Sequence, residues 1–265
     1  MPRAKKVEGS PSTKAKLKIG DLRKVDPLNE SQKKFFDFYN DASRQIIMAH
    51  GVAGTGKTYI AMYKALESVL NKEFEKVLII RSAVQSREIG HLPGDLEEKL
   101  EQYQLPYKHI ASALFTKKAD NLVYPDPYDR LMSQGNLDFA STSFVRGLTF
   151  DNTIVIVDEC QNLNWEELDT IITRVGDHSR IVFCGDYRQT DLRKGTEREG
   201  LFNFMEIVRH MNSYARVEFT VNDIVRSDLV KEYIIAKITA RAIVIDLIPL
   251  EIFFEDVLIN QFKIR

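Results

Sequence analysis

The sequence predicts an α/β fold in which a mostly parallel sheet is covered by helices on both faces. Segments with strand character alternate with segments of helical spacing along most of the chain. Several strand segments, such as residues 76–81 (KVLIIR) and 153–157 (TIVIV), are apolar at almost every position. Runs of this kind are typical of parallel strands that are buried on both faces. The chain shows no internal repeat.

The elements of the first half follow from local signals. The first helix opens at Asn29, a favourable N-cap, and carries aromatic side chains over its next turns. A short apolar run at 45–49 predicts the first strand, and the spacing of apolar residues over 58–70 predicts the second helix. After the strand at 76–81, Pro93 lies where the first turn of a charged helix accepts proline.

The second half continues the alternation. Strands are expected at 137–141 and 153–157, and Asn164 with Glu167 forms a capping-box pattern for a helix through Val175. The remaining expected elements are a strand at 180–184, a helix at 201–211, a strand at 216–220 and a helix at 228–237. The Ile-rich residues 238–265 do not extend the pattern. This tail is open to three interpretations, as an extra strand, an oligomer contact or an atypical terminus.

The composition fits a globular protein that buries a core. The chain has 265 residues, 44% hydrophobic and 28% charged, which allows one domain or at most two. Its 37 basic and 38 acidic side chains leave a net charge of −1, which excludes binding of nucleic acid by bulk positive charge alone. Two cysteines make no disulfide framework, so we expect a reduced, cytoplasmic protein. No stretch reads as a membrane span or signal peptide, and we expect no membrane partner.

The first 28 residues form a basic arm that we expect to be disordered. Residues 1–24 carry eight basic and two acidic side chains, a net charge of +6, which leaves −7 for the rest of the chain. Pro, Ser, Gly and Thr are interspersed among them, and this composition favours disorder. The arm is either a solubilising tail or a tether for nucleic-acid phosphates. The predicted folded domain then covers residues 29–237.

A phosphate-binding motif follows the first predicted strand. Residues 51–58 (GVAGTGKT) match the pattern GxxxxGK[ST] between a strand and a helix, which is the context that the motif requires. Its glycines let backbone N–H groups converge on a phosphate, and the N-terminus of the following helix adds a positive dipole. Lys57 is expected to reach the β- and γ-phosphates, and Thr58 to ligate Mg²⁺. The nucleotide is assigned to Gly51, Gly54, Thr55, Gly56, Lys57 and Thr58.

Two carboxylates follow the strand at 153–157. Asp158 stands at the carboxyl end of this buried strand, where it is expected to meet the metal held by Thr58. Glu159 beside it can polarise a water molecule for attack on the γ-phosphate. A small-molecule kinase does not need such a group, because its nucleophile is the substrate. An ordinary solvated loop carboxylate is the alternative interpretation of Glu159.

Two glutamines complete the predicted nucleotide site. Gln189, in the segment CGDYRQ after the strand at 180–184, is a candidate to sense the γ-phosphate and hold the attacking water, with Asp186 assisting. An ordinary turn is the alternative. Gln32 can donate to and accept from adenine at once, which favours ATP over GTP, and a plain surface glutamine is its alternative. No NKxD guanine motif occurs in the sequence.

Six segments together resemble the PhoH-like family of P-loop ATPases. They are GVAGTGKT, HLPGDLEEKL, SFVRGLTF, IVIVDECQN, GDYRQTDL and EIVRH, in this order. LPGDLEEK and VRGLTFDNTIVIVDECQN are much more specific than the phosphate motif alone. The resemblance runs from about Asn29 to Lys237. It implies a single RecA-like domain related to the motor core of superfamily 1 helicases, ATP hydrolysis, and RNA or single-stranded DNA as partner.

The resemblance also implies roles for individual residues. These are phosphate and magnesium binding by Lys57 and Thr58, metal binding by Asp158, base catalysis by Glu159 and γ-phosphate sensing by Gln189. Residues 219–227 (FTVNDIVRS) resemble the helicase segment that supplies a γ-phosphate arginine, which makes Arg226 the arginine-finger candidate. A surface arginine is the alternative. The candidates for nucleic-acid contacts are Arg81, Ser82, Arg87, Arg146 and Gly147. Judged singly, each is better explained as an ordinary surface or structural residue.

The sequence departs from the family in two places. The tail from Ile238 has no counterpart, and Cys160 replaces the usual alanine after the Asp-Glu pair, where we expect it to act only as a small hydrophobic residue. Larger relatives fuse the domain to a PIN nuclease or an RNA-binding domain. Neither is visible in this sequence, so nuclease activity is not carried over. The compact form with a basic arm resembles versions found in phages.

The expected function is that of a Mg²⁺-dependent ATPase coupled to RNA or single-stranded DNA. A single RecA-like domain needs a neighbouring surface to complete its site, so we expect a homo-oligomer, for which a hexameric ring is one form. The alternative is an ATP-dependent binding switch that acts on a protein partner without strand movement. A metabolic phosphotransferase comes third, because Glu159 disfavours it.

Overall fold

The computed structural model describes residues 16–81, 96–115, 126–142, 145–186 and 195–247. Six strands form one sheet in the order β3-β2-β4-β5-β1-β6, and every neighbouring pair is parallel. The strands are β1 (Ile46–Gly51), β2 (Lys76–Arg81), β3 (Leu137–Ser141), β4 (Thr153–Asp158), β5 (Arg180–Gly185) and β6 (Tyr214–Phe219). The parallel sheet predicted from the sequence is confirmed.

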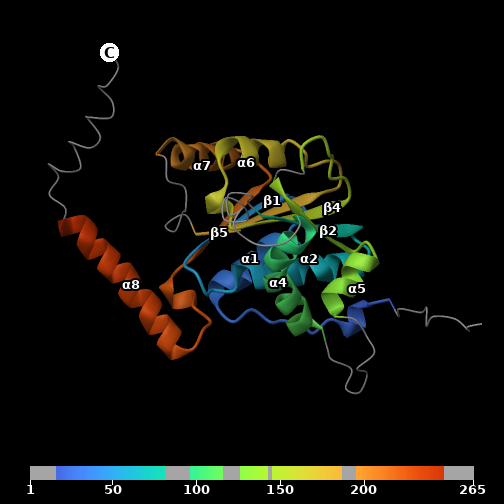
Figure 1. The fold of residues 1–265 in the computed structure, drawn as a ribbon, viewed down its shortest axis with the longest axis horizontal. Helices are drawn as coiled ribbons and strands as arrows, with labels where there is room; N and C mark the ends of the chain where they lie inside the picture. The colour runs from blue at the N-terminus through green and yellow to red at the C-terminus, as the bar shows by residue number, and fades with distance from the viewer. Residues whose placement is uncertain (1–15, 82–95, 116–125, 143–144, 187–194, 248–265) are drawn as a thin grey trace, which may run out of the picture.

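Helices cover both faces of this sheet, as Figure 1 shows. On one face lie α6 (Trp165–Ile172) and α7 (Gly195–Val208). On the other lie α1 (Glu30–Asn40), α2 (Lys57–Leu70), α4 (Leu96–Leu114) and α5 (Pro127–Ser133). A long helix, α8 (Asp228–Leu247), follows β6. The short 3₁₀ turns are η1 (Ile19–Asp21), η4 (Cys160–Asn162) and η5 (Val221–Asp223).

Alternate residues of each strand enter two different core layers. Ile47 and Ala49 of β1 pack with the layer of α1 and α2, whereas Ile46 and Met48 pack with the layer of α6 and α7. Every residue of β1, β4 and β5 is buried. Because both faces of the sheet are covered, these strands need apolar side chains at successive positions. This is the physical reason for the uninterrupted apolar runs in the sequence.

Most element positions agree with the predictions, and some boundaries differ. Helix α6 keeps its predicted capping box but ends at Ile172 rather than Val175. The backbone of the next residues pairs with Phe150 instead, whose N–H donates to the carbonyl of Arg174 at 2.8 Å. Helix α8 runs on to Leu247, past the predicted end at 237, because no glycine or proline interrupts the chain before Pro249.

Two helices differ from the predictions in another way. Helix α7 begins and ends earlier than the predicted 201–211. Helix α5 was not predicted, although Asp126 caps it by accepting a hydrogen bond from the N–H of Tyr128 at 2.9 Å, and Pro127 stands in its first turn. At seven residues this helix is too short to give a periodic apolar signal.

Part of the predicted basic arm packs on the domain. Leu17 is buried in the layer of α1 and α2, Leu22 pairs with Phe115 across an isolated antiparallel bridge, and the N–H of Arg23 donates to the carbonyl of Leu114 at 2.8 Å. The folded domain therefore begins before the predicted boundary at residue 29. Residues 1–15 lie outside the described part of the chain, so the disorder of the arm and its role stay predictions.

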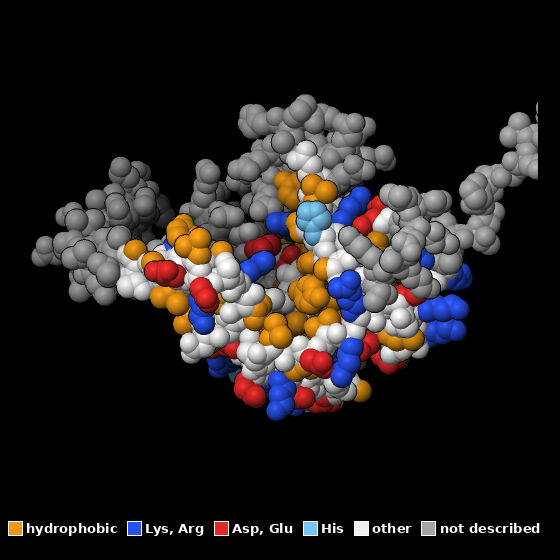
Figure 2. Space-filling model, turned by 90° about the horizontal axis from the view of Figure 1, so that it is seen from below, with side chains coloured by type: hydrophobic (Ala, Val, Ile, Leu, Met, Phe, Trp, Pro, Cys, Tyr) orange, Lys and Arg blue, Asp and Glu red, His pale blue; other side chains and the backbone are white. Residues whose placement is uncertain are grey.

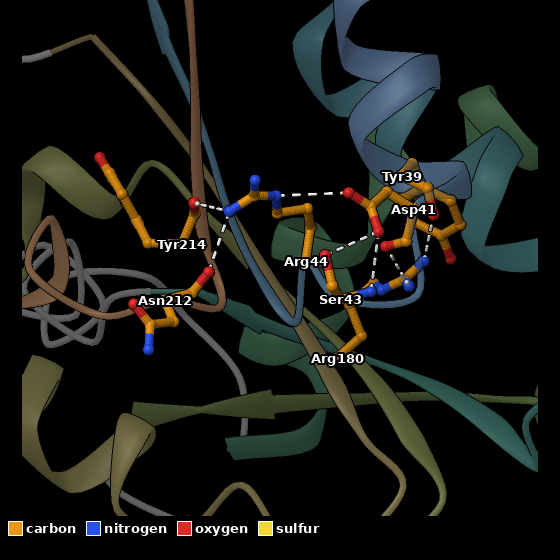
Figure 3. A network of polar contacts seen from close by, with 7 residues as sticks. All are labelled: Tyr39, Asp41, Ser43, Arg44, Arg180, Asn212 and Tyr214. Carbon is orange, nitrogen blue, oxygen red and sulfur yellow. Dashed lines mark hydrogen bonds and ion pairs between the residues drawn. The ribbon is translucent and has the colours of Figure 1, made fainter.

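A polar network ties α1 to the edge at which the strands begin (Figure 3). The guanidinium of Arg180 donates to the carbonyl oxygens of Tyr39 and of Asp41, the latter at 3.3 Å. It also lies over the Tyr39 ring, 4.7 Å from the centroid. Arg44 pairs with the Asp41 carboxylate at 3.4 Å and donates to the carbonyl oxygen of Tyr214 at 3.2 Å. These contacts fix α1 relative to β1, β5 and β6.

The surface carries charges of both signs. Seen from below, basic and acidic side chains are interspersed around a central group of hydrophobic side chains (Figure 2). Among the described residues that this view shows, the two signs of charge are therefore mixed. Within the described ranges, no helix combines the length and the apolar character that crossing a membrane requires.

Candidate functional site

Residues 51–58 run from the last residue of β1 through a tight loop into the first turn of α2, at the carboxyl edge of the sheet. The backbone of Gly51, Gly54 and Gly56 has positive φ angles of 127°, 80° and 84°. At Gly51 the loop passes so close to β6 that an added Cβ would lie 1.9 Å from the carbonyl oxygen of Phe219. Only glycine fits there. The loop thus has the conformation in which backbone N–H groups can surround a phosphate.

The ammonium group of Lys57 lies within this loop. Its Nζ donates to the carbonyl oxygens of Gly51 at 2.7 Å and of Val52 at 2.9 Å. The loop is braced from inside by Thr55, a buried residue whose hydroxyl donates to the Val52 carbonyl at 3.0 Å. Burial lowers the pKa of Lys57, and nearby carboxylates, Glu159 among them, act in the opposite direction. A partly desolvated cation at this position suits an anionic phosphate.

Thr58 and Asp158 touch, although they lie 100 residues apart in the sequence. The Thr58 hydroxyl donates to Oδ1 of Asp158 at 2.7 Å. The other carboxylate oxygen, Oδ2, accepts a hydrogen bond of 2.9 Å from the hydroxyl of Tyr107. A hydroxyl beside one buried carboxylate suits a Mg²⁺ ion that takes its remaining ligands from phosphates and water. In the part of the chain that is described, no three His, Cys, Asp or Glu side chains form an alternative metal cluster.

Glu159 is held in an uncommon backbone conformation next to this pair. Its φ of 52° and ψ of 41° are left-handed, which costs free energy for a residue with a side chain. Gln161 donates through Nε2 to its carboxylate and accepts through Oε1 from the N–H of Asp186 at 3.0 Å. Gly185 makes room for this bridge, since a Cβ there would lie 2.4 Å from Oε1 of Gln161. The carboxylate is therefore fixed relative to both β4 and β5.

The environment of Glu159 also changes its acidity. Burial raises the pKa of this carboxyl, the charge of Asp158 raises it further, and the hydrogen bond from Gln161 opposes the shift. A carboxylate whose pKa is raised toward neutrality is a stronger proton acceptor than a solvated one. The hydrogen bond from Gln161 and the partial burial do not fit a freely solvated loop carboxylate, and the role of Glu159 as a base stays a prediction.

Gln32 holds the phosphate loop from the side of α1. It is only 2% exposed. Its Nε2 donates to the carbonyl of Thr55 at 3.0 Å, and its Oε1 accepts from the N–H of Leu28 at 2.9 Å. The surface alternative is therefore wrong for Gln32. These two contacts leave over one amide hydrogen and one oxygen lone pair of Gln32, and its role in adenine recognition stays a prediction.

Of the predicted arginines, Arg226 lies near the phosphate loop and Arg81 at the end of β2. Arg226 is exposed and lies against the phosphate loop, with its Cγ 3.1 Å from the position of a Cβ added at Gly54. Arg81 stands opposite Asp158 in the parallel register of β2 and β4, and its guanidinium lies 5.7 Å from the ring centroid of Tyr103. Arg146 and Gly147 are exposed. Three predicted residues lie outside the described part of the chain: Ser82, Arg87 and Gln189.

Sequence reasoning missed two residues of this site. Gln161 stands in the segment IVIVDECQN, and its place two residues after Glu159 was the available signal. Tyr107 had no signal, because its contact joins α4 to β4 across the fold. Burial, with the charge of Asp158 added, raises the pKa of the Tyr107 phenol well above its usual range, so it remains a donor. Cys160 is buried, as expected of a small hydrophobic residue, and burial raises the pKa of its thiol.

The chain is similar to proteins of one family. The model of the PhoH-like protein family matches residues 24–238. A PhoH-like protein of Mycobacterium leprae (strain TN) is 34% identical over 211 residues, which are 79% of this chain and 57% of that protein. One of Bacillus subtilis (strain 168) is 35% identical over 190 residues, 71% of this chain and 57% of that protein. The chain thus spans a little over half the length of these relatives.

The chain was also compared with solved structures. The SWI2/SNF2 ATPase core of Sulfolobus solfataricus in complex with double-stranded DNA is similar with a TM-score of 0.41 and 12% identity, over 77% of this chain and 47% of that one. With its parallel sheet and a phosphate-binding loop after β1, the chain has the predicted α/β, RecA-like P-loop NTPase fold.

Proposed function

The chain belongs to the PhoH-like protein family, and on that premise we propose that it binds and hydrolyses ATP with Mg²⁺ and couples hydrolysis to RNA or single-stranded DNA. The 2.7 Å hydrogen bond between Thr58 and Asp158 is the observation that carries the proposal. It joins the helix after the P-loop to the end of β4, so that one hydroxyl and one carboxylate can share a Mg²⁺ ion on a bound nucleotide.

Nucleotide binding is assigned to the P-loop and its two flanks. The loop N–H groups and the Lys57 ammonium bind the phosphates. Gln32 selects adenine with the amide hydrogen and the lone pair that its contacts to Thr55 and Leu28 leave over. Because Gln32 bonds to the P-loop itself, recognition of the base and the shape of the phosphate site are linked.

Hydrolysis is assigned to Glu159. The Mg²⁺ ion, when bound, neutralises charge on the phosphates. Glu159 accepts a proton from a water molecule as the water oxygen bonds to the γ-phosphorus and the bond from that phosphorus to the β,γ-bridging oxygen breaks, which yields ADP and phosphate. Gln161 keeps the carboxylate aimed at this water. Gln189, with Asp186, senses the γ-phosphate, and Arg226 stabilises the charge of the transition state.

Nucleic acid is assigned to the carboxyl edge of β2 and its neighbourhood. Arg81 is the β2 neighbour of Asp158 in the sheet, so a contact at Arg81 would lie beside the metal carboxylate. Arg146 is exposed, and residues 1–15 supply further basic groups. A charge-based contact of this kind binds phosphates without reading sequence.

Self-association is also part of the proposal. Leu229 and Tyr233, on α8, are 76% and 66% exposed, and an interface between copies would remove this apolar surface from water. We therefore keep a homo-oligomer, with a hexameric ring as one form.

The two cysteines are buried and free, which fits a reducing, cytoplasmic compartment.

One assay tests the function. The ATPase rate of the full chain is measured with Mg²⁺ and with EDTA, in the presence and absence of RNA and of single-stranded DNA, with Lys57→Ala as the inactive control. The expected result is Mg²⁺-dependent hydrolysis that nucleic acid stimulates. Hydrolysis that neither nucleic acid changes would favour the binding switch. A rate equal to that of Lys57→Ala would reject the ATPase.

A further inference from the structure

Tyr107 reaches the metal-binding end of β4 from the middle of α4. Its side chain is fully buried, at 0% exposure. Its hydroxyl donates to Oδ2 of Asp158 at 2.9 Å, while Thr58 donates to Oδ1 of the same carboxylate at 2.7 Å. Because the two donors engage different oxygens, together they fix the plane of the carboxylate. Charge-assisted hydrogen bonds of this kind are stronger than bonds between neutral groups.

The surroundings of Tyr107 hold the ring in place. Its centroid lies 5.7 Å from that of Phe139 on β3. Tyr103, one turn earlier in α4, lies over the guanidinium of Arg81, and Arg81 is the register partner of Asp158 on β2. Residues four apart share one face of a helix. This face of α4 therefore touches two neighbouring strand ends, β2 through Tyr103 and β4 through Tyr107.

We propose that Tyr107 is a positioning residue of the magnesium site, which orients the Asp158 carboxylate toward Thr58 and the metal. The role rests on the proposed function, since it concerns Mg²⁺ bound with a nucleotide. A group that hydrogen-bonds to a metal ligand fixes the orientation of that ligand. Loss of such a group lowers the affinity of the site for the metal by about 10- to 100-fold. Tyr107 lies outside all six segments that resemble the family.

A purely structural role predicts something different. Tyr107→Phe keeps the ring and its contact with Phe139 and removes only the hydroxyl. If the hydroxyl served stability alone, the variant would unfold more easily and bind metal as the wild type does. Tyr128 offers a matched control, because its ring is also fully buried on the same face of the sheet and its hydroxyl donates to Gln104 at 3.3 Å, not to Asp158.

The test titrates Mn²⁺ as a probe of the magnesium site. Free Mn²⁺ is followed by electron paramagnetic resonance in the full chain with saturating ADP, for the wild type, Tyr107→Phe and Tyr128→Phe. The affinity for ADP in EDTA is measured in parallel. We expect Tyr107→Phe to bind Mn²⁺ about 10- to 100-fold more weakly than the other two proteins. All three should bind ADP equally in EDTA, because the P-loop is unchanged.

The outcomes separate the positioning role from the function on which it rests. If the wild type binds Mn²⁺ with ADP and Tyr107→Phe binds it equally well, the positioning role is wrong and the proposed function stands. If the wild type takes up no Mn²⁺ with ADP, the proposed function fails and the role of Tyr107 fails with it. Equal losses of ADP affinity with and without metal would also reject the role.

A second pair of variants tests the role of Tyr107 if Tyr107→Phe alone does not fold. When residue 158 is Asn, removing the Tyr107 hydroxyl leaves an amide without its hydrogen-bond partner, not a buried carboxylate. An unpaired buried amide costs less folding free energy than an unpaired buried charge. Asp158→Asn and the double variant Asp158→Asn, Tyr107→Phe are then titrated at millimolar Mn²⁺. Equal affinity is expected, because Tyr107 acts through the carboxylate. A further loss in the double variant would overturn the proposal.

Discussion

The backbone N–H of Val225 donates a 3.0 Å hydrogen bond to the carbonyl oxygen of Gly54, which holds the segment before α8 against the P-loop of the same chain. Arg226 follows directly, and its Cγ lies 3.1 Å from the position of a Cβ added at Gly54. A single chain can therefore bring this arginine to its own nucleotide. The position argues for action within the subunit.

Arg226→Ala should bind ATP like the wild type and hydrolyse it more slowly by about 10³-fold or more, because a guanidinium on the transition-state phosphate supplies that much where it acts. Single-turnover hydrolysis and equilibrium binding measure the two effects. Arg209→Ala, which changes an exposed arginine directly after α7, serves as control.

Mixing Arg226→Ala with Lys57→Ala distinguishes a subunit's own arginine from a neighbour's. With Arg226 beside its own P-loop, we expect no recovery of hydrolysis in mixed oligomers. Recovery of a substantial part of the activity would place the arginine on a neighbouring nucleotide instead.

Lys57→Ala should abolish ATP binding, because it removes the cation that lies within the P-loop.

Glu159→Gln should retain ATP binding and lose hydrolysis by about 10²- to 10⁴-fold, since an amide can pack in place of the carboxylate but cannot accept a proton. Binding is followed with a fluorescent ATP analogue and turnover by phosphate release. The matched change Glu206→Gln, at an exposed glutamate, should alter neither. Turnover by Glu159→Gln near the wild-type rate would reject the base.

Hydrolysis should be active over a narrower pH range than the ordinary pKa values of a glutamate and a lysine would allow. As the proposed base, Glu159 must be deprotonated to act, and burial raises its pKa, so activity should fall on acidification at a pH above the range of an ordinary carboxyl. Lys57 is active when protonated, and burial lowers its pKa, so the alkaline limb should lie below the range of an ordinary lysine. The ratio kcat/KM over pH checks both limbs. ATP binding by Glu159→Gln over the same range separates the two groups, since its alkaline limb should remain.

Gln32→Ala should destabilise the fold and relax base selection. It leaves the Thr55 carbonyl and the Leu28 N–H without their partner, and an unpaired buried polar group costs about 1–3 kcal/mol. Denaturant unfolding measures the loss, and competition between ATP and GTP measures the selectivity. Gln45→Ala, at an exposed glutamine, should change neither. If Gln32→Ala prefers ATP over GTP as strongly as the wild type does, Gln32 does not recognise the base.

Deleting residues 1–15 tests the arm without disturbing the packed segment that contains Leu17 and Leu22. This stretch has four basic and one acidic side chain, a net charge of +3. If this net charge neutralises phosphates of a single strand, each phosphate contributes about 0.7 to the magnitude of the slope of log affinity against log salt concentration. The arm would then account for about 2 of that slope. We expect weaker RNA or single-stranded DNA binding, a flatter salt dependence and an unchanged basal ATPase rate. An unchanged slope would make the arm a solubilising tail.

The sequence by itself determined the parts of this protein that depend on neighbouring residues. The buried strands, the P-loop with its glycines, the cap at Asn164 and the carboxylates at the end of β4 each follow from a short run of residues. Backbone conformation and burial act over a few positions there, so local composition is enough. The placement of Lys57, Thr58, Asp158 and Glu159 around one loop follows from the rule that parallel strands end at a common edge.

Only the tertiary structure decided three other contacts between distant segments. It brought Tyr107 of α4 to Asp158, joined Gln161 to β5 next to Gly185, and placed Arg226 beside the P-loop of its own chain. These contacts depend on the strand order, in which β5 lies between β1 and β4, and on how α4 and α8 pack. Each is a hydrogen bond or van der Waals contact between segments separated along the chain, and no periodicity or short motif encodes such a distance.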